Sequence, residues 1–466
     1  MKKWYRSAIK ILLILFGLVV GFWYHYKFAV NQYLNVDELS SIFYSQNNSY
    51  LDMLQRNVEA THPNLFYFFI KFLLELLPIV DLRVIMWGIF LLSTFVVYKI
   101  YRRLELNWFE AGMASIFWVF SAKILELTFM VRMYGLGVLI MLISLLFFLL
   151  YQQKKGLRKK IYLWLVLIIN MVGFSVVFGY VCIVIIEFIW LAYRKKRAKY
   201  FLLIELLVMC LYLVEEILIR GGEIKGLLFW VETTNLQTFY LFVVKVLGIG
   251  VFHSLFIVII LFCLGGVIYR SRQKDLGMMV YISFLVLEGS FLGAVIFLPY
   301  MFHEMQLFAP VIVFLIGVIG ILVVSLRDRN KFYFGAFLYL VLLLSNVVQF
   351  NRKLEDRRGN KYDEVMDTSF VFKEMNINKY FLEEDYSFMY YYCGRLGTKI
   401  ENLAECKSKG FLPINNYEMI KNFNGKFILR LPDYKVGLFD KYRGDYRNNI
   451  HCLEYDSYLS LYICNN

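Results

Sequence analysis

The side chains best able to do chemistry are acids and arginines in the first third of the chain. Asp37 and Glu38 directly follow the first long apolar run. Arg83, and later Arg132 with Tyr134, stand where further apolar runs begin. A carboxylate within hydrogen-bond reach can act as a general base, and the fork of an arginine can bind two oxygens of a phosphate. Together these residue types could activate a hydroxyl and hold a leaving phosphate.

Two histidines are further candidates for binding a phosphate. His62 begins the segment 62–65, which leads into an apolar run, and His303 stands beside Glu304. Each candidate also has an ordinary interpretation. The acids and the His303-Glu304 pair could be solvated loop residues. The arginines could anchor helix ends at the membrane surface, and His62 could only orient a helix.

The elements that must position these residues are membrane helices. The 466 residues are 60% apolar and 18% charged, whereas an ordinary globular protein is about a quarter charged. Apolar runs long enough to span a bilayer recur along most of the chain, and in lipid such runs can only be helices. We predict an α-helical polytopic membrane protein with about 11 transmembrane helices.

The net charge of +14 does not indicate a nucleic-acid partner. The basic residues form short clusters between apolar runs, as at 102–103, 154–160 and 194–199. Because lysine and arginine stay on the cytoplasmic side of short membrane loops, these clusters predict a cytoplasmic N-terminus and a multi-pass plasma-membrane protein. The composition fits a bacterial plasma membrane, with the endoplasmic reticulum membrane as an alternative.

The first apolar run, about 9–29, has no cleavage site after it and is predicted to be an uncleaved signal anchor. The run from Asn64 to Pro78 is too short to span, so we expect a juxtamembrane helix within a large first outer loop, 31–83. The run from Ile161 to Tyr193 has basic residues on both flanks and must hold two short helices, with Gly173 and Gly179 as candidate sites for the break. The other predicted spans are about 84–101, 108–124, 134–152, 200–219, 241–268, 276–297, 307–326 and 332–350.

We therefore predict two domains: a membrane domain, 1–350, and a soluble extracytoplasmic α/β domain, 351–466. In the second, strands are expected near 387–392, 426–431 and 460–463, and a helix near 369–381. Cys182, Cys210 and Cys263 fall in predicted spans. Four cysteines fall in the tail, where up to two disulfides can form in any of three pairings: Cys393, Cys406, Cys452 and Cys464.

The order of the motifs resembles the GT-C superfamily of membrane glycosyltransferases. The likeness is to the branch of protein O-mannosyltransferases (glycosyltransferase family 39) and of the aminoarabinose transferases that modify lipid A. That branch has an Asp-Glu pair after the first span and a His-Pro-Pro-Leu motif that begins a juxtamembrane helix. It also has an Arg-Leu at the second span and an Arg-Tyr at the outer entry of the fourth. The counterparts are Asp37-Glu38, His62-Pro63-Asn64-Leu65, Arg83-Val84 and Arg132-Met133-Tyr134.

The resemblance is best over residues 1–150 and departs from the family pattern in three places. Asn64 replaces the second proline, and Met133 separates the arginine from the tyrosine. His303-Glu304 stands where the family often has an Arg-Tyr before a proline, here Pro310. These departures concern the residues that would hold the donor phosphate.

The resemblance implies an enzyme that moves a sugar from a polyprenyl-phosphate donor to an envelope glycan, lipid or protein at the outer face. It implies that Asp37 is the general base and that Glu38 orients the acceptor or the donor sugar. The residues that would bind the donor or its phosphate are Arg132, Tyr134, His62, Arg83 and His303. No nucleotide-binding glycine motif and no His/Cys metal-ligand set occurs, although Asp37, Glu38 and Glu126 could share a divalent cation.

Two other classes of function stay open at this stage. A transporter or flippase for lipid-linked glycans would place ionisable residues near the bilayer midplane; Glu288 is one acid inside a predicted span, with no partner apparent from the sequence. A non-catalytic scaffold for envelope assembly would act through its tail. A flippase would move labelled lipid without changing its chemistry, and a scaffold would lose a partner when 351–466 is deleted.

Overall fold

The structure is a computed structural model, and it divides the chain into two compact units. One comprises Met1–Asn31 and Tyr44–Leu354, and the other Gln32–Phe43 and Glu355–Asn466. The structure describes residues 2–31, 38, 41–42, 44–45, 48–54, 63–77, 82–227, 274–296, 308–326 and 332–358, together with five strands between 380 and 465.

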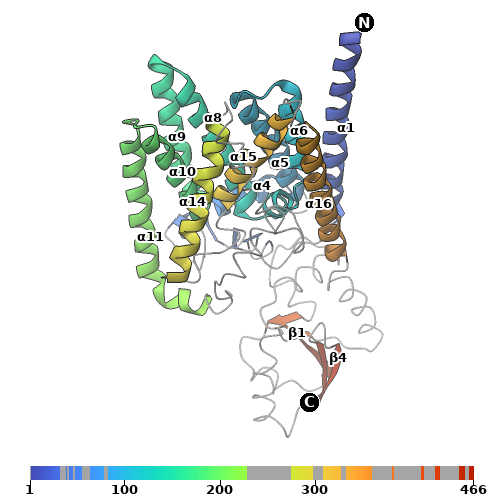
Figure 1. Ribbon diagram of the computed structural model, residues 1–466. Helices are drawn as coiled ribbons and strands as arrows, with labels where there is room; N and C mark the ends of the chain where they lie inside the picture. Colours follow the sequence, from blue (N-terminus) through green and yellow to red (C-terminus); the bar gives the residue numbers. More distant parts are fainter. Residues whose placement is uncertain are drawn as a thin grey trace. The chain divides into compact units, whose positions relative to one another are not determined.

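The first unit is helical (Figure 1). Its N-terminal helices are α1 (Lys2–Asn31), α3 (Tyr50–Leu54), α4 (Leu65–Leu76), α5 (Leu82–Arg103), α6 (Trp108–Val119), α7 (Ala122–Phe129) and α8 (Met133–Gln153). They are followed by α9 (Gly156–Val176), the 3-10 turn η2 (Phe178–Tyr180), α10 (Val181–Tyr193), α11 (Lys199–Leu227), α14 (Lys274–Ile296), α15 (Phe308–Ser325) and α16 (Phe332–Arg358). Within the described residues, five helices are long and apolar enough to cross a membrane: α1, α5, α8, α9 and α15. The protein is an integral membrane protein.

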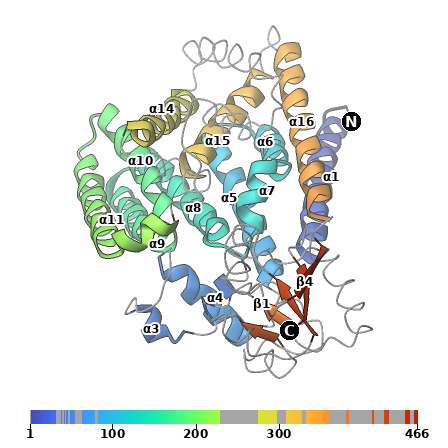
Figure 2. The ribbon, with the colours of Figure 1, turned by 90° about the horizontal axis from the view of Figure 1, so that it is seen from below.

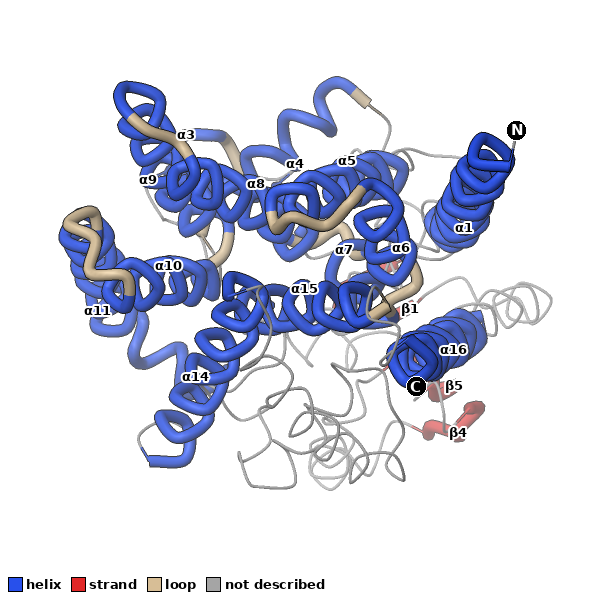
Figure 3. The backbone as a smooth tube through the Cα atoms, turned by 45° about the horizontal axis from the view of Figure 1, so that its top comes forward, coloured by secondary structure: helices blue, strands red, loops and turns tan. Residues whose placement is uncertain are grey.

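Helix α15 forms the core of this unit. It contains no charged side chain, and every residue from Phe308 to Val323 is buried. It contacts α6, α8, α10 and α14, and Figures 2 and 3 show it between α14 and α6. The Tyr101 hydroxyl of α5 donates to the Ile316 carbonyl over 3.2 Å. A helix that is apolar on all sides is one surrounded by other helices.

Close packing fixes the first helix against α6. At Gly21 a Cβ atom would lie only 2.2 Å from Val119 Cγ1, so the two helices approach where the glycine lacks a side chain. His25 Nε2 lies 2.7 Å from the Val119 carbonyl oxygen, and the His25 ring stacks on Phe90 of α5 at 4.0 Å. These contacts hold the C-terminal end of α1, which precedes the predicted first outer loop.

The described helices confirm five predicted spans, as α1, α5, α8, α9 and α15, and correct one. The predicted span 108–124 is wrong: α6 ends at Val119, and a separate helix, α7, runs over Ala122–Phe129. The predicted break between Ile161 and Tyr193 is confirmed, because α9 ends at Val176 and α10 begins at Val181. The predicted span 241–268 lies outside the described residues. The total number of spans therefore stays a prediction.

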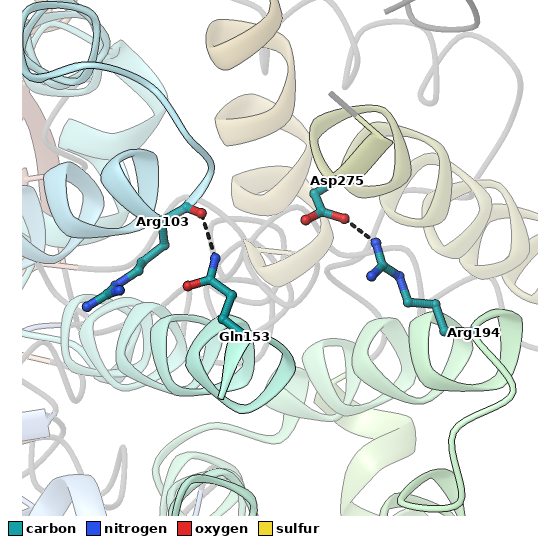
Figure 4. A network of polar contacts seen from close by, with 4 residues as sticks. All are labelled: Arg103, Gln153, Arg194 and Asp275. Carbon is teal, nitrogen blue, oxygen red and sulfur yellow. Dashed lines mark hydrogen bonds and ion pairs between the residues drawn. The ribbon is translucent and has the colours of Figure 1, made fainter. Parts of the chain in front are cut away.

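Helix ends that carry predicted cytoplasmic clusters are joined in pairs (Figure 4). The Gln153 amide at the end of α8 donates to the Arg103 carbonyl at the end of α5 over 2.8 Å. Arg194, just after α10, forms an ion pair with Asp275 at the start of α14. The C-terminal ends of α5 and α8 therefore lie together, as the predicted alternation of spans requires.

The second unit contains a five-stranded mixed sheet. Its strands are β1 (Tyr380–Leu382), β2 (Phe411–Pro413), β3 (Lys426–Arg430), β4 (His451–Asp456) and β5 (Leu461–Asn465), in the order β2-β1-β3-β5-β4. β1 is parallel to β2 and β3, whereas β5 is antiparallel to β3 and β4. The strands expected near 426–431 and 460–463 are confirmed as β3 and β5. The strand expected at 387–392 lies outside the described residues.

The helix expected near 369–381 is wrong at its end, because Tyr380 and Phe381 belong to β1. The earlier residues of that segment lie outside the described part of the chain. Tyr380-Phe381-Leu382 pairs with a strand on each side. Aromatic residues fit strands well, and pairing on both sides outweighs the local helical pattern.

Candidate active site

Helices α5, α7 and α8 pack against one another, and each has a cationic side chain in its first turn or directly before it. α7 contacts α5, α6 and α8. Arg83 lies in the first turn of α5, Lys123 in the first turn of α7, and Arg132 directly precedes α8. Because α7 has eight residues, it is about 12 Å long. We call Arg83, Lys123 and Arg132 the basic cluster because their three helices pack together; Lys123 and Arg132 flank opposite ends of α7.

Arg83 is buried, with 4% of its surface exposed. An arginine that only anchors a helix at the membrane surface keeps its head group in water. A buried guanidinium instead requires hydrogen-bond or charged partners. Its burial favours a specific binding or structural role over that of an interfacial anchor.

Arg132 occupies the N-cap position of α8 in an extended conformation, with φ −136° and ψ 162°. It is half-buried, and its Cζ atom lies 6.0 Å from the centroid of the buried Tyr134 ring. The first amides of a helix point outward from its N-terminus and favour an anion there. The ring and the amides together place the arginine where a phosphate would be stabilised.

Gly135 allows this helix start to approach its neighbours. A Cβ atom there would lie 2.9 Å from the Thr128 carbonyl oxygen of α7 and 2.5 Å from Met86 Cε of α5. Met86 lies one helical turn after Arg83. The glycine therefore brings the N-terminus of α8 against both helices that carry the other two cations.

Lys123 is the member of the basic cluster that the sequence did not suggest. It is 2% exposed, and the sequence pattern placed it near the end of a single span. A lysine inside an apolar run is a functional candidate by default, and that signal could have identified it. The backbone of Glu126 lies in the same short helix.

The other predicted site residues are placed only in part. Glu38 is fully buried and belongs to the second unit. Asp37, His62 and His303 lie outside the described residues. The structure thus brings Arg83 and Arg132 with Tyr134 to one end of the helices, and their position relative to the acidic pair stays a prediction. In the described segments there is no cluster of three His, Cys, Asp or Glu side chains that could hold a metal.

The helix expected after His62-Pro63 is confirmed as α4, which begins at Leu65. The Asn64 side chain donates to the Met53 carbonyl of α3, which ties the two helices together. Within the predicted short run, Lys71 Nζ lies 3.4 Å from the Ser45 carbonyl and Glu75 accepts from the Tyr50 hydroxyl over 3.0 Å. Lys71 and Glu75 therefore connect α4 to Ser45 and to the start of α3.

The fold of the whole chain is similar to that of a solved structure, and this likeness supports, at the level of the fold, the resemblance seen in the motifs. That structure is the crystal structure of ArnT from Cupriavidus metallidurans in the apo state. The TM-score is 0.57 with 11% sequence identity, and the match covers 99% of this chain and 98% of that chain. No protein-family model and no curated protein sequence matches the chain.

Proposed function

We propose that this protein is a membrane glycosyltransferase that uses a polyprenyl-phosphate-linked sugar. The fold supports this most strongly, because the likeness to ArnT extends over 99% of the chain, including its C-terminal part. A fold alone does not define a function. Arg83 and Arg132 add support at the level of the site, because they lie at the contacting starts of α5 and α8 and cations there suit a leaving phosphate.

In the proposed reaction, a hydroxyl or phosphate oxygen of an envelope acceptor attacks the anomeric carbon of the donor sugar. Asp37 takes the proton of an attacking hydroxyl, and Glu38 orients the acceptor or the sugar. The bond between the anomeric carbon and the phosphate oxygen breaks, and both electrons leave with the polyprenyl phosphate. Attack opposite the leaving group inverts the anomeric centre.

The leaving phosphate gains negative charge as that bond breaks, so fixed cations stabilise the transition state more than the ground state. Arg132 would contact it first, with Tyr134 holding the guanidinium in place. Arg83 and Lys123 would add positive charge from α5 and α7. His62 and His303 are further candidates for donor binding.

A transfer assay in liposomes tests these roles. A panel of polyprenyl-phosphate sugars is offered to the wild type, to Asp37→Asn and to Asp52→Asn, and release of free polyprenyl phosphate is followed. Asp52 is a matched control because it lies in the same loop. It is partly exposed, and hydrogen bonds from the Ser49 side chain and amide hold its pKa below the usual value.

We expect release by the wild type and by Asp52→Asn, and a loss of about 100-fold or more in Asp37→Asn. Arg132→Gln should also lose activity, whereas Arg158→Gln, at an exposed position of α9, should not. Full activity of Asp37→Asn in inserted, folded protein would exclude Asp37 as the base.

A further inference from the structure

A polar cluster lies inside the membrane unit, away from the basic cluster. Five elements each contribute one side chain to it: Ser144 from α8, Asn170 from α9, Tyr180 from η2, Glu187 from α10 and Glu205 from α11. Ser144, Asn170, Tyr180 and Glu187 are fully buried, and Glu205 is 6% exposed. Buried acids in membrane helices carry a large free-energy cost and usually mark a function.

Asn170 connects the two carboxyl groups. Its side-chain nitrogen donates to Glu187 Oε2 over 2.9 Å and lies 3.4 Å from Glu205 Oε2. The Ser144 hydroxyl lies 2.7 Å from Asn170 Oδ1 and 3.1 Å from Glu187 Oε1. The Tyr180 hydroxyl lies 3.4 Å from Asn170 Oδ1. The two acids therefore share one amide at the junction of the helices.

The hydrogen bonds favour different protonation states for the two acids. Both oxygens of Glu187 accept hydrogen bonds from the cluster. Glu205 has one long contact, and its buried Oε1 atom has no hydrogen-bond partner among the described residues. An ionised carboxylate buried without donors is strongly disfavoured. Of the two, Glu187 is the better supported anion and Glu205 the better site for a proton.

No described cation neutralises the pair. Along the helices, Lys199 lies six residues before Glu205 and Arg194 seven residues after Glu187, which corresponds to about 9–11 Å. Arg194 is already paired with Asp275. Two negative charges this close in an apolar interior repel each other strongly.

The ionisable groups on the surrounding elements do not change this balance. Tyr180 is a neutral member of the cluster, Cys182 lies five residues before Glu187 on α10, and Tyr212 of α11 packs against Phe174 and Phe178. α15 contains no ionisable side chain. Other ionisable side chains are described on the elements that surround the cluster. They are Tyr67, Lys71 and Glu75 of α4, Tyr134 and Tyr151 of α8, and Arg158, Lys159, Lys160 and Tyr162 of α9. The others are Tyr193 of α10, Tyr200 and Cys210 of α11, and Asp275, Tyr281 and Glu288 of α14.

We propose that Glu187 and Glu205 form a proton-binding site within the membrane unit, in which one proton resides on Glu205 and holds α11 against α9 and α10. The ligand is a proton rather than a metal cation, because the Asn170 amide already occupies the space between the two carboxyl groups. Loss of the proton would leave two charges in the interior and loosen α11. This inference is independent of the proposed transferase activity.

The test is thermal unfolding of the full chain in detergent from about pH 6 to about pH 9. A buried acid that is protonated in the folded state binds more protons than in the unfolded state. The stabilisation that the protonated acid provides is therefore present at low pH and lost as pH rises. We expect the wild-type melting temperature to fall by about 3–6 °C over this range.

Glu205→Gln imitates the protonated acid. It should remove the fall in melting temperature at high pH and keep the melting temperature that the wild type has at low pH. Glu288→Gln, at a half-buried position of α14, is the matched control and should leave the fall unchanged. In infrared spectra, the band of a protonated carboxyl group should disappear at high pH in the wild type and be smaller from the start in Glu205→Gln.

Three results would overturn the proposal. The wild type could have a pH-independent melting temperature, or Glu205→Gln could lower stability equally at all pH values. Sodium chloride, but not choline chloride at equal ionic strength, could also stabilise the wild type saturably at high pH and not Glu205→Gln. That result would assign the site to a metal cation instead.

Discussion

Replacing Gly135 by alanine should disturb the basic cluster without touching any of its members. The new Cβ atom would meet Met86 Cε at 2.5 Å and the Thr128 carbonyl oxygen at 2.9 Å. The end of a methionine can move aside, whereas a backbone carbonyl cannot move alone. The gap to Thr128 is about 0.5 Å shorter than an ordinary van der Waals contact. The first turn of α8, with Arg132 before it, must therefore shift away from α7.

The matched control is Gly88→Ala in α5, where nothing lies within 4 Å of the new Cβ atom. Both substitutions gain about 0.5–1 kcal/mol from the better helix propensity of alanine. The crowding at Gly135 should cost about 1–3 kcal/mol. We therefore expect Gly135→Ala to be less stable than Gly88→Ala by about 2 kcal/mol, or about 2–4 °C in melting temperature.

The assay combines thermal unfolding with sugar transfer from the polyprenyl-phosphate donor. Because displacement by about 1 Å can reduce a rate 100-fold, a shift of half that size should lower kcat/KM by about 10-fold in Gly135→Ala. Gly88→Ala should keep wild-type activity. Equal stability and equal activity of the two variants would refute the role assigned to the close contact of α8 with α7.

Three further predictions concern other parts of the chain. Lys123→Met should lower kcat/KM for the donor at least about 10-fold, because the leaving phosphate loses a fixed positive charge. Unchanged kinetics in folded protein would remove Lys123 from the site. Gly173→Ala should destabilise the protein by about 1–3 kcal/mol in thermal unfolding, because the new Cβ atom would lie 2.1 Å from the Tyr180 ring. A variant as stable as the wild type would contradict the packing of η2 on α9. Cys452 and Cys464 are directly paired across β4 and β5, and directly opposed residues of antiparallel strands lie within the range of a disulfide. If the tail is extracytoplasmic, peptide mapping without reductant should find this disulfide. Free thiols would contradict that location.

The sequence predicted the helices well where apolar length and charge position both applied. The break within Ile161–Tyr193 followed from basic residues on both flanks, and it lies at Val177, between the two suggested glycines. The juxtamembrane helix also followed from length, because the run after Asn64 was too short to span. Both predictions rest on a physical limit set by bilayer thickness.

The division of 108–124 into α6 and α7 had no comparable signal. No glycine or proline stands at Phe120-Ser121, and the composition stays apolar across the break. The two helices instead separate because α7 packs on α5 and α8. Lys123 was overlooked for the same reason, since its burial at a helix junction depends on tertiary contacts.

The pairing of Glu187 with Glu205 also could not be predicted from the sequence. Ser144, Asn170, Glu187 and Glu205 are isolated polar residues in three apolar runs, with Asn170 and Glu187 both in the run 161–193. Their spacing along the chain does not indicate that they meet, because this depends on how α8, α9, α10 and α11 pack. Glu288, the intramembrane acid that the sequence did suggest, lies half-buried on α14.

The most direct test of the account is whether purified wild-type protein consumes a lipid-linked sugar donor. Proteoliposomes are given polyprenyl-phosphate donors labelled in the sugar, with membrane extract as the source of acceptors, and the lipid products are analysed by mass spectrometry. We predict that free polyprenyl phosphate accumulates and that the label appears on an acceptor. If folded protein only moves intact labelled donor between the leaflets, or leaves every donor unchanged, the assignment as a glycosyltransferase is contradicted.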